Sequence, residues 1–204
     1  MIDAPNVGLV SLFFASILTS NILLANFLGM CSFISISKDF KSSMGLGLAV
    51  TMVIGICSAV CWAVLYFIIK PLGIEYLSFI IFIIVIAAVV QMLEMIIDRF
   101  SPSLYMALGI FLPLITVNCA VLGVILFMQI RSYNFLQAVV FGFGSGAGWW
   151  LAIMLLAAIR TKLDANNAVP AGLKGTGITL ITIGFMAMAR SEEHTSELQS
   201  PNTI

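Results

Sequence analysis

Two cysteines, Cys31 and Cys119, lie in long apolar runs that are interrupted by polar or small residues. The first run reads NILLANFLGMCS and the second reads GIFLPLITVNCAVLG. Cysteine thiolates are the usual ligands of iron–sulfur clusters, and a [2Fe–2S] cluster takes four ligands. This pair could therefore supply half of such a site. The alternative is that each thiol is a small buried hydrophobe, and the wide spacing without a CxxC motif favours this alternative.

The other two cysteines, Cys57 and Cys61, lie four residues apart and so share one face of a helix. They could complete a four-thiolate set within one chain. No polar break interrupts their run, and simple packing is the favoured interpretation. Because all four cysteines lie within or at the edge of apolar runs, an exported disulfide framework is not expected.

One acidic residue, Glu94, is predicted to lie inside the end of a membrane span. An intramembrane carboxylate is a candidate waypoint for a cation or a proton. The alternative is that its side chain reaches the interface or pairs with a nearby arginine. Asn26, Thr116 and Asn118 are further candidates for lining an ion path or cavity near the cysteines, although such side chains more often bond across helices.

The elements that must position these residues are membrane helices. Of the 204 residues, 61% are apolar and 9% are charged, whereas soluble domains have roughly 45–50% and 25%. The chain is therefore predicted to be an all-α polytopic membrane protein, and its net charge of zero gives no sign of a nucleic-acid partner. A bilayer core needs about 20 apolar helical residues. Six spans are predicted, at about residues 7–31, 44–68, 76–97, 104–128, 135–159 and 173–189.

The first and fourth spans are expected to be broken. The first apolar run gives about thirty residues, or roughly 45 Å of straight helix, which is too long for one crossing. A turn near Asn26 to Cys31 would absorb the excess, with Gly29 supplying the backbone freedom. In the fourth span the break is expected at Pro113, because proline removes a helical hydrogen bond.

The second and fifth spans both begin with glycine-rich sequence, MGLGLA and GFGSGAGWWLA, for which close helix packing is the favoured interpretation. The order of broken, glycine-rich and plain span thus occurs twice. This order predicts two inverted three-helix repeats, about residues 7–97 and 104–189, within one membrane domain over 1–189. Inverted repeats of this kind place a site near the membrane midplane, between the broken helices.

Basic residues set the predicted orientation. Six of them follow the first, third and fifth spans, and two follow the second and fourth. By the positive-inside rule, both termini should lie outside. The hydrophilic residues 190–204 are expected to be a non-native read-through tail that replaces the end of the sixth span. The basic residues are Lys38, Lys41, Arg99, Arg160, Lys162 and Lys174 in the first set, and Lys70 and Arg131 in the second.

Five segments carry a likeness to a known family: FLGMCSF, SKDFKSSMGLGLAV, QMLEMIIDRFSPSLYMALGIFLPLITVNCAVLG, GFGSGAGWWLAI and VPAGLKGTGITLIT. They resemble the paired membrane subunits of the sodium-pumping NADH:quinone reductase (Nqr) and of the related Rnf complex. The resemblance covers about residues 7–189. Within the family, the sequences of these segments are most similar to the E subunits of Nqr, followed by the A subunits of Rnf.

The resemblance implies a six-helix inverted-repeat protein. We expect it in the bacterial inner membrane, where the orientation predicted from the basic residues places both termini on the periplasmic side. Its partner would be a homologous subunit of opposite orientation, similar to the D subunit of Nqr or the E subunit of Rnf. Cys31 and Cys119 would join two cysteines of that partner around one shared [2Fe–2S] cluster, which carries electrons across the membrane while the complex moves Na⁺. NAD, flavins and quinone would bind other subunits. Because this chain has no nucleotide-binding motif of its own, it would be an enzyme only as part of that translocase.

Two other functions remain open at this point. An autonomous secondary transporter would fit inverted repeats equally well, with the broken helices holding an ion or a small anion. A purely structural membrane anchor would need neither cysteine. The leading hypothesis is a one-electron carrier subunit of an NADH-driven ion pump.

Overall fold

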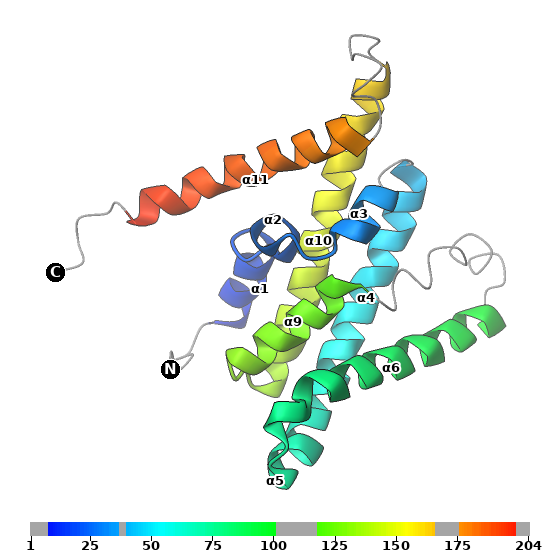
Figure 1. The fold of residues 1–204 in the computed structure, drawn as a ribbon, viewed down its shortest axis with the longest axis vertical. Coiled ribbons are helices and arrows are strands. Elements are labelled where there is room, and N and C mark those ends of the chain that lie inside the picture. Colours follow the sequence, from blue (N-terminus) through cyan, green and yellow to red (C-terminus); the bar gives the residue numbers. More distant parts are fainter. Residues whose placement is uncertain (1–7, 37–39, 101–117, 166–175, 199–204) are drawn as a thin grey trace.

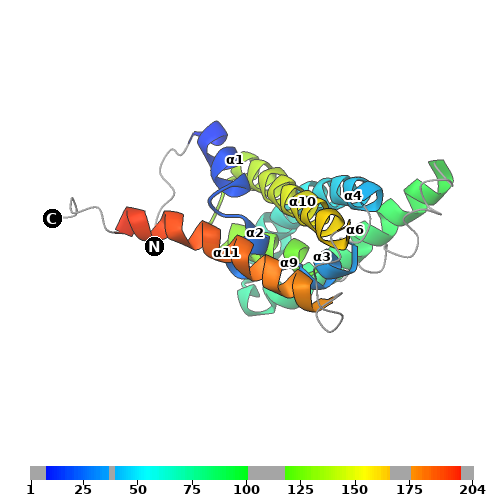
Figure 2. The same cartoon turned by 90° about the horizontal axis from the view of Figure 1, so that it is seen from above.

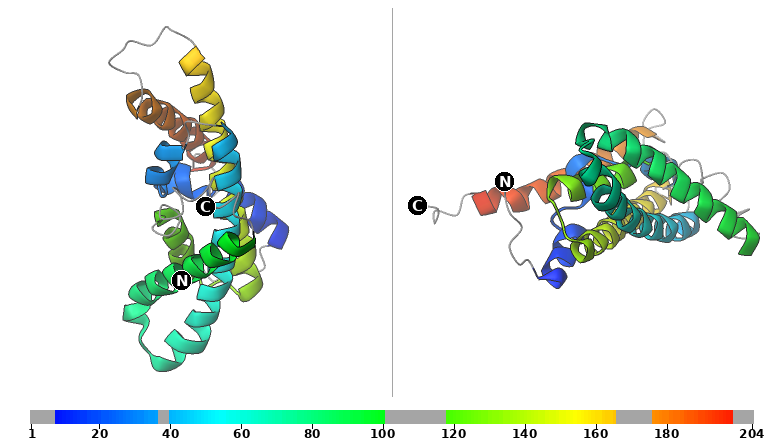
Figure 3. Two further views of the ribbon diagram at one scale, coloured as in Figure 1. Left: turned by 90° about the vertical axis from the view of Figure 1, so that its right-hand side faces the viewer. Right: turned by 90° about the horizontal axis from the view of Figure 1, so that it is seen from below.

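A computed structural model describes residues 8–36, 40–100, 118–165 and 176–198. Over these residues the protein is helical and contains no strand, which confirms the predicted all-α class for the described part of the chain. Two long helices, α4 (Phe40–Val64) and α10 (Phe135–Ala165), lie side by side and form the centre of the bundle (Figure 1). They run along most of the length of the molecule (Figure 3).

The helix α4 is continued by η1 (Leu65–Ile69), a π-helical turn, and by α5 (Lys70–Leu72). The helical winding stops at Gly73, which takes a φ of 66°, a left-handed conformation that glycine adopts without penalty. A short 3₁₀ turn, η2 (Glu75–Leu77), then leads into α6 (Ser78–Phe100). The chain therefore reverses direction here, and α6 runs back across one flank of α4 (Figure 1).

Shorter helices surround this centre. α1 (Leu9–Ile17) packs on α10, and α2 (Ile22–Asn26) and α3 (Met30–Ile36) follow it along the chain. α9 (Cys119–Ile130) packs against α4, α6, α10 and α2. α11 (Thr176–Leu198) contacts α2 and α10 and then extends away from the bundle (Figure 2).

Glycines on α10 allow its neighbours to approach closely. A Cβ at Gly146 would lie 2.9 Å from the Thr51 Cα of α4, and a Cβ at Gly148 would lie 2.9 Å from the Ile17 carbonyl oxygen of α1. Along α10, the glycines therefore face α4 and α1 in alternation. The close packing predicted for this run is confirmed. The glycines of α10 that contact α4 or α1 in this way are Gly142, Gly144, Gly146 and Gly148.

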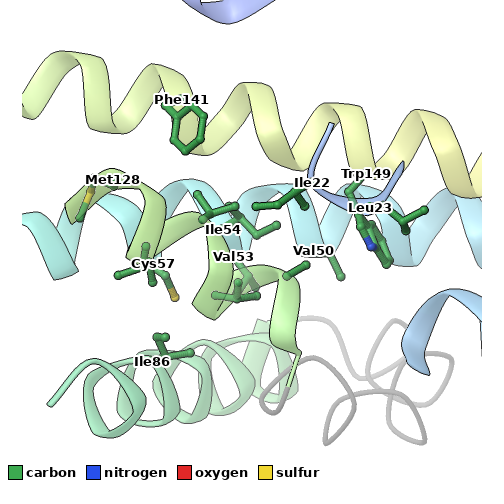
Figure 4. Packing of buried hydrophobic residues seen from close by; sticks show 14 of the residues in the cluster. Ile22, Leu23, Val50, Val53, Ile54, Cys57, Ile86, Met128, Phe141 and Trp149 are labelled. Carbon is green, nitrogen blue, oxygen red and sulfur yellow. The ribbon is translucent and has the colours of Figure 1, made fainter. Parts of the chain in front are cut away.

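The hydrophobic core lies between α4 and α10 and is closed by side chains of α2, α6 and α9 (Figure 4). Its largest fully buried side chains include Trp149 and Phe33. By contrast, α6 presents exposed apolar side chains such as Phe79, Ile80 and Ile84. An apolar outer surface suits a lipid environment, because lipid tails are themselves as apolar as leucine.

Three described helices are long and apolar enough to cross a membrane, and they correspond to the second, third and fifth predicted spans. They cover Ser43–Leu72, Glu75–Ile96 and Phe135–Leu163. Two shorter apolar helices, Cys119–Ile130 and Gly177–Met188, coincide with parts of the fourth and sixth. The helix that coincides with the sixth predicted span, α11, continues past residue 189 to Leu198. The break predicted at Pro113 lies outside the described residues.

The first predicted span is broken between α2 and α3, as expected. Phe27 and Gly29 take positive φ values of 54° and 89° there. A further interruption at residues 18–21 separates α1 from α2 and was not predicted. Asn21 stabilises it, because the Asn21 side-chain oxygen accepts a hydrogen bond from the Leu23 N–H at 3.1 Å and so caps α2.

The glycine contacts predict that the response to alanine depends on position. Gly146→Ala should lower the melting temperature of the detergent-purified protein, because the added Cβ forces α10 away from α4, and overpacking of this kind costs about 1–3 kcal/mol. Gly45→Ala on α4 is the matched control, since a Cβ there meets no atom within 4 Å. Thermal unfolding followed by tryptophan fluorescence measures the difference. Equal melting temperatures for the two variants would contradict the packing described here.

Candidate metal centre

Cys31 and Cys119 each lie at the start of a helix. Cys119 is the first residue of α9, and Cys31 is the second residue of α3. The first turn of a helix carries unpaired backbone N–H groups and the positive end of the peptide dipoles. Each sulfur therefore lies beside backbone N–H groups that can donate to it.

The loop before Cys31 makes the link to Cys119. Within this loop, Gly29 donates its backbone N–H to the Cys119 Sγ at 2.8 Å. The Gly29 carbonyl accepts a hydrogen bond from the Ser32 hydroxyl at 3.0 Å, which stabilises the start of α3. A single glycine therefore connects the two cysteine-bearing segments, which lie 90 residues apart in the sequence.

Asn118 shapes the other side of the contact. Its side-chain oxygen accepts a hydrogen bond from the Ala120 N–H at 3.0 Å and so caps α9. The Asn118 side chain is buried. This cap fixes where α9 begins, and it therefore fixes the place of Cys119 at the first helical position.

The two thiols are neighbours in space. The Cys119 side chain lies close enough to the Cys31 side chain for the two to interact electrostatically. Cys31 is exposed and Cys119 is half-buried, so the pair is open on one side. The structure thus brings together the two cysteines that the sequence singled out.

Cys57 and Cys61 do not belong to this group. Both are fully buried on α4 within the hydrophobic core, where Figure 4 shows Cys57. Among the residues that the structure describes, no three or more His, Cys, Asp or Glu side chains gather where they could hold a metal ion. The described part of the chain therefore brings together one pair of thiols, Cys31 and Cys119, whereas Cys57 and Cys61 contribute to packing.

The other candidate residues are distributed over the molecule. Asn118 lies directly beside the cysteine pair, as the cap of α9. Asn26 is the exposed last residue of α2, and Glu94 is half-buried on α6. Thr116 lies outside the described residues. Of the residues predicted to line an ion path or cavity, the described structure thus places Asn118 at the cysteine site.

A buried tryptophan at the site was not predicted. A Cβ at Gly29 would lie 2.7 Å from the Trp149 Nε1 and 3.1 Å from the Ala120 Cβ. Trp149 is fully buried, and its ring projects from α10 beside Leu23 of α2 (Figure 4). In the sequence it follows the glycine-rich run of the fifth span. That position indicates burial, but it does not show which loop the indole reaches.

Known proteins resemble this chain over most of its length. Residues 9–191 match the family described as Rnf-Nqr subunit, membrane protein. The chain belongs to the Rnf-Nqr family. The E subunit of a Na⁺-translocating NADH-quinone reductase from Serratia proteamaculans is 55% identical over 185 residues, which cover 88% of this chain and 93% of that protein. The E subunits from Proteus mirabilis and Chlamydia trachomatis serovar L2 are 51% and 49% identical, over 88% and 92% of this chain and 93% and 81% of their own lengths.

The Rnf-Nqr match includes every element of the cysteine site, from Gly29 to Trp149. It confirms the resemblance found in the sequence segments. Together with the long apolar helices, it establishes a multi-pass membrane protein of this family.

The proximity of the two thiols predicts that both react with one molecule of a reagent that bridges neighbouring thiols. In metal-free protein that carries Cys57→Ala and Cys61→Ala, one molecule of phenylarsine oxide should bridge Cys31 and Cys119, because trivalent arsenic binds two neighbouring thiols. Intact-protein mass spectrometry measures the adduct. Adding Cys119→Ala to the same background is the control and should abolish stable binding. A protein that retains both thiols and takes up no arsenic would contradict the contact.

Gly29 should be essential for this reactivity. Gly29→Ala introduces a Cβ at a positive φ, which costs about 1–2 kcal/mol, and directs it at the Trp149 indole. We expect the fraction of arsenic-bridged protein to fall. Gly73→Ala is the matched control, because Gly73 also has a positive φ but a Cβ there meets no atom within 4 Å. If the fraction of arsenic-bridged protein in both variants equals that of the parent protein, Gly29 does not hold the loop before Cys31 in place.

Proposed function

We propose that this chain is the membrane subunit of a Na⁺-translocating NADH:quinone reductase that contributes Cys31 and Cys119 to a [2Fe–2S] cluster shared with a homologous subunit. The observation that carries the proposal is the proximity of the two thiols on an open side of the bundle, where the Gly29 N–H bond to the Cys119 Sγ joins their segments. The names of the relatives support it, since proteins that match most of the chain are named as the E subunit of that reductase.

The donor atoms suit an iron–sulfur cluster. Both are cysteine sulfurs, and the Cys119 Sγ already accepts a backbone N–H bond from Gly29. Hydrogen bonds to sulfur are among the features that set the reduction potential of such clusters. A Mg²⁺ or Ca²⁺ site would instead need several oxygen ligands. No Asp or Glu joins the two cysteines in the described structure to form a larger ligand group.

Each residue of the site has a separate task. Cys31 and Cys119 would hold the cluster, which when bound accepts and donates single electrons. Gly29 stabilises negative charge on the Cys119 sulfur through its N–H, and Asn118 holds the start of α9 in place. Trp149 is fully buried and helps to exclude water from the inner side. A site of low polarity strengthens each of these electrostatic interactions.

Two further ligands would come from a partner protein. Because Cys31 is exposed, a second protein can approach the pair from the open side. The partner that fits is a homologous subunit of opposite orientation, similar to the D subunit of Nqr. The corresponding partner in an Rnf complex would be similar to the E subunit of Rnf.

The proposal includes six spans in two inverted repeats. The interrupted segment from α1 to α3 would be the first broken span, and α9 would be the second half of the other. Two half-helices that enter the membrane from opposite sides would bring their starts to a common depth, where Cys31 and Cys119 meet. Both termini would then face the periplasmic side of a bacterial inner membrane.

Ion and substrate chemistry would be divided among the members of the complex. NAD, flavins and quinone would bind other subunits, because this sequence contains no nucleotide-binding motif. For Na⁺, the half-buried Glu94 on α6 is the acidic candidate for a waypoint. Asn26, Thr116 and Asn118 remain candidates for polar groups along the same path.

Electron paramagnetic resonance of the whole complex tests the cluster assignment. Dithionite-reduced, anaerobically purified complex should give a [2Fe–2S] signal, and Cys31→Ala or Cys119→Ala should abolish both this signal and quinone reduction. Cys57→Ala is the control, because it removes a thiol that is buried in the core, and it should retain the signal. A [2Fe–2S] signal of full strength in the Cys31→Ala complex or in the Cys119→Ala complex would contradict the proposal.

A further inference from the structure

Four buried polar side-chain atoms have no hydrogen-bond partner within the described residues. They are the Asn118 Nδ2, Ser145 Oγ, Trp149 Nε1 and Trp150 Nε1. A buried donor without an acceptor destabilises a protein, so native structures rarely keep one without a reason. Two of the four, on Asn118 and Trp149, belong to the cysteine site.

The Trp149 indole nitrogen lies against the same glycine that holds Cys119. It is 2.7 Å from the point where a Cβ of residue 29 would lie, while the Gly29 N–H donates to the Cys119 Sγ at 2.8 Å. The indole and the sulfur therefore flank one residue. Because residue 29 is glycine, no side chain separates the indole from the loop.

The Asn118 side chain lies at the same place. Its Oδ1 is 3.3 Å from that same Cβ position. This oxygen is occupied by the Ala120 N–H at 3.0 Å, which fixes the orientation of the carboxamide. The Nδ2 group is left with its two hydrogens and no acceptor among the described residues. Asn118 and Trp149 thus both carry N–H groups without an acceptor beside Gly29, the residue that donates to the Cys119 sulfur.

The nearby backbone acceptor is already saturated. The Gly29 carbonyl accepts from the Ser32 hydroxyl at 3.0 Å and from the Phe33 N–H at 3.0 Å. An indole nitrogen can only donate, and an amide NH₂ can only donate as well. An electron-rich group that does lie beside Gly29 is the Cys119 sulfur, which accepts the Gly29 N–H, together with the sulfur group that it would help to bind.

We propose that Trp149 is a positioning residue whose indole N–H, together with the Asn118 NH₂, donates hydrogen bonds to the anionic sulfur group held by Cys31 and Cys119. This inference rests on the proposed function. With the Gly29 N–H, three donors would then surround that group on its buried side. Such donors stabilise the more negative, reduced form and so raise its reduction potential. The absence of a side chain at residue 29 is what gives the indole access.

The experiment compares Trp149→Phe with Trp150→Phe in the whole complex. Both changes keep an aromatic ring and remove one buried indole N–H, but the Trp150 nitrogen lies against Gly47 of α4 instead of Gly29. Redox titration followed by electron paramagnetic resonance should show that Trp149→Phe shifts the reduction equilibrium about tenfold toward the oxidised form, or about 59 mV for one electron. Trp150→Phe should leave the potential unchanged.

Proton and nitrogen couplings give a second readout that a packing role would not produce. Electron–nuclear double resonance of wild-type complex labelled with ¹⁵N-indole tryptophan should show a coupled ¹⁵N and an exchangeable proton. Trp149→Phe should lose the ¹⁵N coupling and the proton coupling of the indole, while exchangeable protons of the Gly29 N–H and the Asn118 NH₂ remain, and Trp150→Phe should keep every coupling. The labelled wild type gives this answer even if Trp149→Phe fails to assemble.

The outcomes separate the two proposals. A wild-type complex without any [2Fe–2S] signal would overturn the proposed function and this inference together. A normal wild-type signal without ¹⁵N coupling, or with equal potentials in the two phenylalanine variants, would overturn the role of Trp149 and leave the proposed function standing.

Discussion

The hydrogen bond from the Gly29 N–H to the Cys119 Sγ is the interaction on which the candidate site depends. It joins a loop of the first predicted span to the helix start of the fourth, and it brings Cys31 against Cys119. It forms only if the chain leaves the helical path before Cys31, because a continuous helix would have used the Gly29 N–H internally. The positive φ values at Phe27 and Gly29 are therefore part of the site itself.

Interrupting a helix at membrane depth has a cost that the surrounding residues must offset. Lipid offers no hydrogen bonds, so freed backbone groups need partners within the protein. Asn21 supplies one by capping α2 after the interruption at residues 18–21, and Asn118 supplies another by capping the start of α9. Asn21 also donates to the Gly148 carbonyl of α10 at 2.8 Å, which ties the interrupted segment to the centre of the bundle. The asparagines that look out of place in an apolar run thus stabilise the starts of α2 and α9.

Hydropathy and length were sufficient to predict much of this architecture. The second, third and fifth spans are unbroken helices whose apolar runs alone locate them, and the break at Gly29 followed from an apolar run too long for one crossing. The break at residues 18–21 could not be predicted, because it depends on a long-range bond from Asn21 to Gly148. The meeting of Cys31 with Cys119 depends on how distant helices pack, and local spacing favoured two unrelated buried thiols. The position of the Trp149 indole against Gly29 was not predicted for the same reason. The place of Trp149 in the sequence indicates burial but does not show which residue its side chain contacts.

The glycines of α10 have a mechanical consequence. Gly146 lies against the α4 backbone and Gly148 against the α1 backbone, so α10 is fixed from two directions at once. A helix held in this way cannot slide or rotate unless both interfaces separate. The short helix α2 ends at Phe27 in a left-handed conformation, and the hydrogen bond from Asn21 to the Gly148 carbonyl ties its start to α10. If the protein changes shape during its cycle, α1, α4 and α10 would therefore move together as one rigid unit.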